Sequence, residues 1–306
     1  LTRGVMINKI NGHSIKEIVD TCFEYIPTDG YNTTHKYQSL SNRGYFGSLY
    51  TSIYGSADSY NIEYMDSMGR LKYTTIKAYY PAADTFARSV LRATRPVRQP
   101  SRKENKERQR NSIRLHKIDT ATHVAMMDLN SFGRGYGLQK FFKRSFKSIR
   151  KNDVSHMIID VRGNGGGSVT NSTEITRYLS RDRFKVADSL YAITKKKKYS
   201  QYIKNDFFNR LFITFFAGKK KDGYYHFRYF EKHYFKPKKK NHFDGQVYIL
   251  TGGNSFSATT LFAGSLEKQD NVTVVGEETG GGAYGNSAWL IPDVTLPNTK
   301  VRFRLP

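Results

Sequence analysis

Three segments of the sequence place glycines and hydroxyl side chains directly after a short apolar stretch. They are IIDVRGNGGGS (158–168), VYILTGGNSFSATTLFAGSL (247–266) and VVGEETGGGAYGN (274–286). Each is typical of a buried strand that ends in a glycine-rich turn, and open α/β sheets build their sites at the carboxyl ends of strands. A single turn of this kind indicates only a sharp bend in the chain. Three such turns together predict a functional site.

The second segment contains two candidate nucleophiles, Ser255 and Ser257, at the junction between a strand and a helix. A serine on such a turn can project its hydroxyl into a cleft, while the N–H of the next residue helps to bind a developing oxyanion. The alternative is helix capping, for which Ser255 is well suited. Their position in the sequence leaves both interpretations open for both serines.

The first segment presents backbone N–H groups at the start of a predicted helix, which makes it a natural cradle for an anion. Phosphate binding is the rival interpretation, but neither the spacing GxxxxGK[ST] nor GxGxxG occurs here. We expect Asp160 and Arg162 to pair and hold the turn, which is a structural role.

The elements that would position these turns follow the order of a layered α/β fold. Short apolar runs predict strands, and apolar residues at helical spacing predict helices. The predicted strands are 124–129, 156–161, 246–250 and 272–275, and the predicted helices are 137–150, 169–179 and 257–266. An insertion at about 185–243, dense in Lys, Tyr and Phe, interrupts this order. It could stack on nucleic-acid bases or form a β-rich flap over a site.

The N-terminal part has a different pattern. Residues 4–26 predict a short strand, a turn at Asn11 and Gly12, and an amphipathic helix, an order that resembles the middle of a PDZ-like domain. Alternating polarity at 60–80 predicts a β-hairpin. We therefore predict three regions: an α+β region at 1–91, a basic linker or loop at 92–118 and an α/β unit at 119–306.

The composition limits the classes of function. The chain has 50 Lys and Arg against 26 Asp and Glu, and its formal charge of +24 attracts nucleic acid, anionic lipid or acidic peptides. Short lysine runs are typical of solvated loops, so we expect no specific nucleic-acid site. The single cysteine, Cys22, excludes an intrachain disulfide. No apolar run reaches the roughly 18 residues of a transmembrane helix.

Taken in order, the three segments resemble the core of the tail-specific or C-terminal processing serine peptidases, a family that includes the tricorn core proteases. The family pattern D-x-R-x-N-x-G-G is met by Asp160, Arg162, Asn164, Gly166 and Gly167. The S-A-S-E segment corresponds to Ser257, Ala258, Thr259 and Thr260, and G-E-x-T-x-G to Gly276, Glu277, Thr279 and Gly281. The PDZ-like opening fits the same family.

This resemblance implies an α/β (α+β overall) fold, with a crotonase- or ClpP-like catalytic core behind part of a PDZ-like module. It implies peptide-bond hydrolysis through an acyl-enzyme on Ser257, with an oxyanion hole made by the amides of Ala258 and of the Gly165–Gly166 turn. It implies no metal and no organic cofactor. The expected partner is a polypeptide, bound at its C-terminal end or at acidic segments. The expected location is bacterial and exported: periplasmic, attached to the outer membrane or secreted.

The general base is harder to assign. In Ser-Lys members of the family a lysine follows the last glycine of the third segment, where this chain has Gly282, and Thr260 replaces a frequent glutamate. The pattern favours the tricorn-related branch, in which the base is a histidine. That histidine usually precedes the PDZ-like segment, and its acidic partner would follow Pro306, so we interpret the chain as a fragment. Within it, His35 in a polar loop is the candidate base.

Two alternatives from other classes stay open. One is a catalytically inactive peptide-binding protein on the same fold. The other is a basic nucleic-acid-binding protein, whose affinity would fall steeply with added salt.

Overall fold

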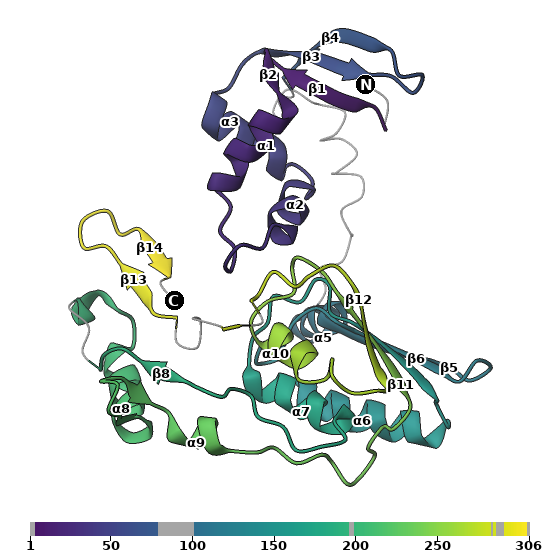
Figure 1. Cartoon of the computed structure of the whole chain (residues 1–306), viewed down its shortest axis with the longest axis vertical. Helices are drawn as coiled ribbons and strands as arrows, with labels where there is room; N and C mark the ends of the chain where they lie inside the picture. The colour runs from purple at the N-terminus through teal and green to yellow at the C-terminus, as the bar shows by residue number, and fades with distance from the viewer. Residues whose placement is uncertain (1–3, 79–100, 196–198, 283, 286–290, 305–306) are drawn as a thin grey trace. The chain divides into compact units, whose positions relative to one another are not determined.

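A computed structural model describes residues 4–78, 101–195, 199–282, 284–285 and 291–304 (Figure 1). The chain divides into two compact units. The N-terminal unit comprises residues 1–28 and 35–108, and the C-terminal unit comprises residues 29–34 and 109–306. Each unit has a hydrophobic core of its own. The boundary predicted near residue 91 lies outside the described residues.

The N-terminal unit contains a four-stranded antiparallel sheet in the order β2-β1-β3-β4. The strands are β1 (Met6–Ile10), β2 (His13–Ser14), β3 (Ser59–Met65) and β4 (Leu71–Lys77), and the helices are α1 (Ile15–Glu24), α2 (Thr34–Leu40) and α3 (Tyr45–Tyr54). Ile18 and Cys22 of α1 pack with Tyr50 of α3 against the sheet. The predicted strand, turn and helix at the start of the chain are confirmed, and so is the hairpin formed by β3 and β4.

The C-terminal unit is built around a five-stranded sheet in the order β12-β11-β7-β6-β5. The strands are β5 (Arg114–Asp119), β6 (Val124–Leu129), β7 (His156–Asp160), β11 (Gln246–Thr251) and β12 (Val272–Gly276). Strands β6, β7, β11 and β12 pair in parallel, and β5 joins β6 in the antiparallel direction. The four predicted strands are confirmed. Parallel pairing therefore places the carboxyl ends of β7, β11 and β12 side by side.

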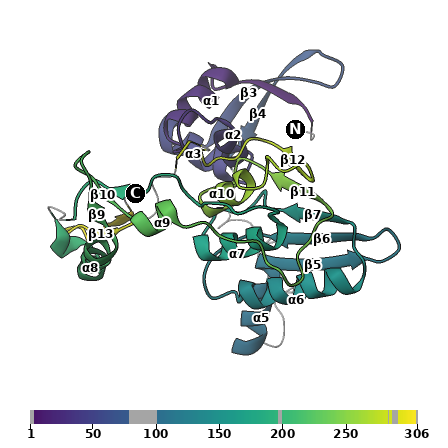
Figure 2. The same ribbon diagram turned by 60° about the horizontal axis from the view of Figure 1, so that its bottom comes forward.

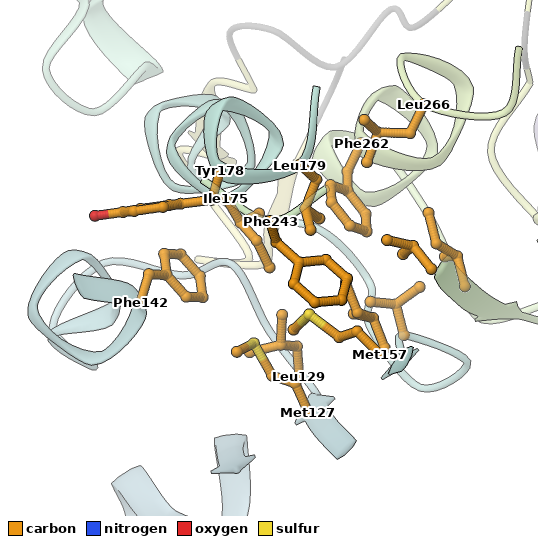
Figure 3. Packing of buried hydrophobic residues seen from close by; sticks show 14 of the residues in the cluster. Met127, Leu129, Phe142, Met157, Ile175, Tyr178, Leu179, Phe243, Phe262 and Leu266 are labelled. Carbon is orange, nitrogen blue, oxygen red and sulfur yellow. The ribbon is translucent and has the colours of Figure 1, made fainter. Parts of the chain in front are cut away.

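Three helices pack on this sheet: α6 (Leu138–Lys151), α7 (Val169–Leu179) and α10 (Ala258–Gly264) (Figure 2). Side chains alternate between the two faces of a strand, so Met127 is fully buried while its neighbour Met126 is 41% exposed. Figure 3 shows how Phe142 of α6, Tyr178 of α7 and Phe262 of α10 gather over the buried methionines. This packing fixes the strand ends and the helix starts that follow them.

Helix α5 (Arg102–Ile113) occupies a part of the sequence for which we predicted a basic linker or loop. The prediction was wrong here because Arg, Lys, Glu and Gln favour a helix even without an apolar face. A capping box starts the helix: Ser101 Oγ accepts the N–H of Glu104 at 3.2 Å, and Glu104 Oε2 accepts the N–H of Ser101 at 2.6 Å. Strand β5 follows directly, so the core sheet also begins within the predicted linker. Residues 92–100 lie outside the described residues.

The insertion contains both helices and strands and is not β-rich. Its elements are β8 (Tyr191–Ala192), the 3₁₀ helix η1 (Ser200–Tyr202), α8 (Asp206–Phe216), β9 (Gly218–Lys219), β10 (Tyr225–His226) and α9 (Arg228–Lys232). Ile213, Ala217 and Phe227 form its small core. The hairpin of β13 (Asp293–Thr295) and β14 (Arg302–Arg304) joins it where the N–H of Lys204 donates to Asp293 O at 2.9 Å.

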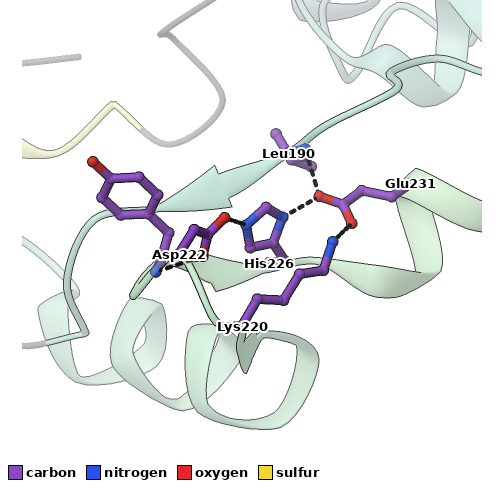
Figure 4. A network of polar contacts seen from close by, with 6 residues as sticks. Leu190, Lys220, Asp222, His226 and Glu231 are labelled. Atoms are coloured by element: carbon purple, nitrogen blue, oxygen red, sulfur yellow. Dashed lines mark hydrogen bonds and ion pairs between the residues drawn. The ribbon is translucent and has the colours of Figure 1, made fainter.

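A buried histidine is held between two carboxylates in the insertion (Figure 4). His226 Nδ1 lies 2.6 Å from Glu231 Oε1, and its Nε2 lies 2.7 Å from Asp222 Oδ2. The hydrogen bond to Glu231 raises the pKa of His226 although burial opposes this. Burial alone would raise the pKa of Glu231, but donors from Lys220, the N–H of Leu190 and His226 lower it to about 2.

These shifts predict a maximum in the stability of the insertion at mildly acidic pH. A raised histidine pKa stabilises the fold below the ordinary value of 6.5 and loses that effect as pH rises through the folded pKa. The lowered pKa of Glu231 stabilises above 4.5 and loses its effect as pH falls toward 2. Thermal unfolding midpoints of the wild type and His226→Gln, measured against pH, check this. Identical profiles above pH 6.5 would contradict the assignment to His226.

Candidate active site

The turns that follow β7, β11 and β12 are joined to one another by backbone hydrogen bonds. The N–H of Phe256 in the second turn donates to Asn164 O of the first at 3.2 Å. The N–H of Gly281 in the third turn donates to Ser255 O of the second at 3.1 Å. The structure thus brings the three glycine-rich segments into one site around residues 255–257.

Ser257 lies at the tip of the second turn in a backbone conformation that serine rarely adopts. Its φ of 55° and ψ of −121° are strained for a residue with a Cβ, and such conformations persist where the surroundings enforce them. It immediately precedes α10 but makes no side-chain capping hydrogen bond. The residue is half-buried. A strained serine between a strand and a helix is the geometry of a nucleophile turn.

Ser255 has a different role. Its side chain is fully buried, its Oγ donates to Val161 O at 2.8 Å, and the same Oγ accepts the N–H of Gly252 at 3.3 Å. These two bonds tie the end of β7 to the turn after β11. The hydroxyl of Ser255 therefore has a structural role, whereas Ser257 is only half-buried.

We predict that Ser255→Ala lowers the free energy of unfolding by about 1–3 kcal/mol, because it leaves the buried N–H of Gly252 without its partner, while Val161 O keeps the N–H of Asn164. Urea denaturation measures the loss. Ser265→Ala is the matched control, since the Ser265 hydroxyl only bonds back to Leu261 O in its own helix, and we expect a change within about 0.5 kcal/mol. Equal losses for the two variants would contradict the clamp.

Two glycines let the neighbouring turns approach Ser257. A Cβ on Gly166, whose φ is +96°, would lie 2.8 Å from Ser257 Cβ and 2.7 Å from Phe256 O. A Cβ on Gly281 would lie 3.1 Å from the Ser257 amide nitrogen and against the hydroxyl of Thr260. The first and third turns therefore pack directly on the backbone of Ser257, and a side chain at Gly166 would block that contact.

Residues 123–303 match the model of peptidase family S41. The chain belongs to peptidase family S41. This membership confirms the family that the three segments resemble. The matched residues include all three turns of the site and every strand of the five-stranded sheet except β5.

Two structures of mature CPAF share the fold of this chain. Mature CPAF complexed with lactacystin shares 14% sequence identity over 99% of this chain and 68% of that chain, with a TM-score of 0.55. A second structure of mature CPAF gives 13% identity, 99% and 67% coverage, and a TM-score of 0.54. The photosystem II D1 C-terminal processing protease gives 13% identity, 92% and 53% coverage, and a TM-score of 0.36. The predicted α/β (α+β) class is confirmed. No curated protein sequence matches the chain.

The amides proposed for the oxyanion hole need a correction within this S41 site. The N–H of Gly166 is already bound by Asn164 Oδ1 at 2.9 Å. The N–H of Gly165 belongs to the same peptide group as Asn164 O, which accepts from Phe256, and the two ends of a trans peptide point in opposite directions. It therefore points away from Phe256. Ala258 is the first residue of α10, where a helix leaves its N–H without an intrahelical acceptor.

Asn164 is a site residue whose role sequence reasoning missed, since it entered only as a letter of the family pattern. It is fully buried, and its Nδ2 donates to Leu129 O at 2.9 Å while its Oδ1 holds the N–H of Gly166. One amide side chain thus fixes the first turn to the end of β6. An asparagine just before a glycine pair was the available signal, because such side chains bond to backbone two residues on.

The expected pairing of Asp160 and Arg162 is present, with Arg162 Nη2 2.6 Å from Asp160 Oδ2. The hydrogen bond from Arg162 lowers the pKa of Asp160 although burial opposes it. The carboxylate also accepts the N–H of Arg162 at 3.0 Å. Both groups therefore hold the turn after β7.

His35 lies on helix α2, not in the loop that we predicted. The prediction was wrong because Thr34 starts a short helix that the polar sequence does not reveal. His35 Nε2 lies 3.3 Å from Ser39 Oγ, one turn along the same helix. His35 belongs to the N-terminal unit, whereas Ser257 belongs to the C-terminal unit. The structure therefore leaves the base of this S41 site open.

Neither a metal cluster nor a membrane span is found in the described part of the chain. No group of three or more His, Cys, Asp or Glu side chains there is arranged to hold a metal ion. No helix among the described residues is long and apolar enough to cross a bilayer.

Proposed function

We propose that this S41 chain hydrolyses peptide bonds with Ser257 as its nucleophile. The observation that carries the proposal is the strained backbone of Ser257, at φ 55° and ψ −121°, at the junction of β11 and α10. A conformational strain of about 1–3 kcal/mol is kept only where the surrounding fold enforces it, and such strain concentrates at functional sites. The turns after β7 and β12 both pack on the backbone of this serine.

The oxyanion hole is proposed to combine the N–H of Ala258 with the N–H of Gly167. Gly167 shares a peptide group with Gly166 O, which accepts the N–H of Phe132 at 2.9 Å. The N–H of Gly167 therefore points away from Phe132. It has no acceptor among the described residues. Two such donors stabilise the charge that develops on a carbonyl oxygen under attack.

In this mechanism the Ser257 hydroxyl attacks the peptide carbonyl while a base removes its proton. The oxyanion collapses to an acyl-enzyme, the amine leaves with a proton from the conjugate acid, and water then releases the acid product. We propose a histidine as the base, and His35 is the candidate within the chain. His35→Ala would then lower kcat and abolish the acidic limb of the pH–rate profile, whereas a purely structural role would leave that limb in place.

The proposed substrate is a polypeptide, and the site lies beside a cleft of suitable size. The cleft has a volume of about 630 Å³ and is lined by β12, Thr260 and the third turn. Strand β12 has no further strand on its outer side among the described residues, so an extended peptide can pair with it. Two lysines and four carboxylates line the cleft, and Lys185 pairs with Asp188, so the cleft itself does not select an acidic segment. An exported location stays a proposal.

Labelling with a fluorophosphonate tests the function, since the reagent modifies activated serines. We expect the full-length wild type to be labelled and Ser257→Ala to be unlabelled, with Ser255→Ala labelled in proportion to its folded fraction. Equal labelling of the wild type and Ser257→Ala would refute the assignment of Ser257. A folded wild type that is not labelled would favour the inactive peptide-binding protein.

A further inference from the structure

Helix α8 of the insertion exposes four phenylalanines to solvent. Phe207, Phe208, Phe215 and Phe216 are 66%, 69%, 75% and 56% exposed. At about 3.6 residues per turn all four fall within one half of the helix circumference. Phenylalanine is normally buried, and a contiguous exposed apolar patch marks an interaction site. The aromatic face of α8, as we name these four residues, is such a patch.

The opposite side of α8 anchors the helix to the insertion. Ile213 is 3% exposed and Ala217, which ends the helix, is 6% exposed, and both pack with Phe227. Asp206 at the start of the helix is also buried. Because these residues hold the inner side, the aromatic face cannot turn inward without breaking the core of the insertion.

Positive charge surrounds the aromatic face. Residues 185–243 contain 16 Lys and Arg against 4 Asp and Glu, a net charge of +12 out of +24 for the whole chain. Lys204 precedes α8, Arg210 lies on it, and Lys219 and Lys221 follow it, all of them exposed. Arg210, Lys219 and Lys221 form no salt bridge with another described residue, whereas the charge of Lys204 helps to lower the pKa of Asp293. The charges of Arg210, Lys219 and Lys221 are therefore available to an external anionic partner.

We propose that α8 binds the surface of a membrane that contains acidic lipids. Its rings would enter the boundary between headgroups and acyl chains, while the lysines around it meet the lipid phosphates. The helix has 11 residues and is about 16 Å long, so it lies in the interface and does not span the bilayer. A helix with an aromatic face and lysines around it can lie flat on an anionic bilayer. This inference does not depend on the proposed catalysis.

Co-sedimentation with vesicles tests the proposal. We expect the wild-type chain to bind vesicles of phosphatidylcholine with phosphatidylglycerol and not vesicles of phosphatidylcholine alone. The double variant Phe208→Ser, Phe215→Ser should bind the acidic vesicles roughly 100-fold more weakly, since each ring contributes about tenfold when it leaves water. Lys219→Gln with Lys221→Gln should also weaken binding and reduce its dependence on salt.

The matched control is Tyr25→Ser with Tyr73→Ser, which removes two exposed rings, at 61% and 71%, from the N-terminal unit and should leave vesicle binding unchanged. Circular dichroism verifies that every variant is folded. Three results would overturn the proposal: no binding by the wild type, equal binding by the wild type and the phenylalanine variant, or equal binding to both vesicle types. A wild type that dimerises while the phenylalanine variant is monomeric would instead assign the aromatic face to self-association.

Discussion

Replacement of Ser257 by alanine or by glycine is expected to abolish peptidase activity while separating the two variants in stability. Loss of a serine nucleophile lowers kcat by about ten-thousandfold or more. Alanine keeps the strain at φ 55°, so the free energy of unfolding of Ser257→Ala should stay close to that of the wild type. Glycine adopts positive φ without a Cβ penalty, and Ser257→Gly should be about 1–2 kcal/mol more stable than Ser257→Ala.

Peptide hydrolysis by the full-length protein and urea denaturation measure these two effects. A rise in stability that accompanies loss of activity is the signature of strain held for function. Retention of activity by either variant would exclude Ser257 as the nucleophile. Equal stability of the two variants would mean that the turn relaxes and that the backbone conformation of residue 257 does not lower the free energy of unfolding.

Gly166→Ala is expected to have the largest effect outside the nucleophile itself. Its Cβ would lie 2.7 Å from the backbone oxygen of Phe256, which cannot move independently, and the φ of +96° is strained for alanine. We expect a loss of about 2–5 kcal/mol in the free energy of unfolding. A displacement of about 1 Å at the reacting group costs roughly 100-fold in rate, so activity should fall by at least that factor.

The adjacent glycine supplies a strict control. A Cβ on Gly165 would meet no atom within 4 Å, and this residue does not have a positive φ. Gly165→Ala should therefore change the free energy of unfolding by less than about 1 kcal/mol. Urea denaturation curves and kcat/KM values for Gly165→Ala and Gly166→Ala measure the difference between the two positions. If both variants lose stability and activity equally, the close approach of Gly166 to Ser257 is not what matters.

Much of the catalytic unit could be predicted from the sequence, because its elements carry strong local signals. The runs HMIIDV and QVYIL are short, apolar and rich in β-branched residues, and both form central strands. The helical spacing of Leu138, Phe142 and Phe146 predicts the buried face of α6. The three glycine-rich turns were predictable as a shared site since each follows such a strand.

Other features depend on contacts that no local pattern encodes. A capping box starts α5 although Ile113 is its one apolar residue, and the edge strand β5 is ordered by its pairing with β6. Ser255 is buried because its hydroxyl forms a hydrogen bond with Val161 O, 94 residues away in the sequence. No local pattern distinguishes it from Ser257. The occupied amide of Gly166 depends likewise on how Asn164 is oriented.

The hydrogen bonds that join the three turns also bear on how activity can be controlled. The N–H groups of Phe256 and Gly281 are held by turns that extend from different strands, so neither turn can open alone. Their amide hydrogens should exchange with solvent only when the whole sheet unfolds. We therefore expect the turn that carries the proposed nucleophile to stay assembled in the folded protein. Control of hydrolysis would then act on delivery of the proton acceptor or on access of the substrate, and not on the shape of the serine turn.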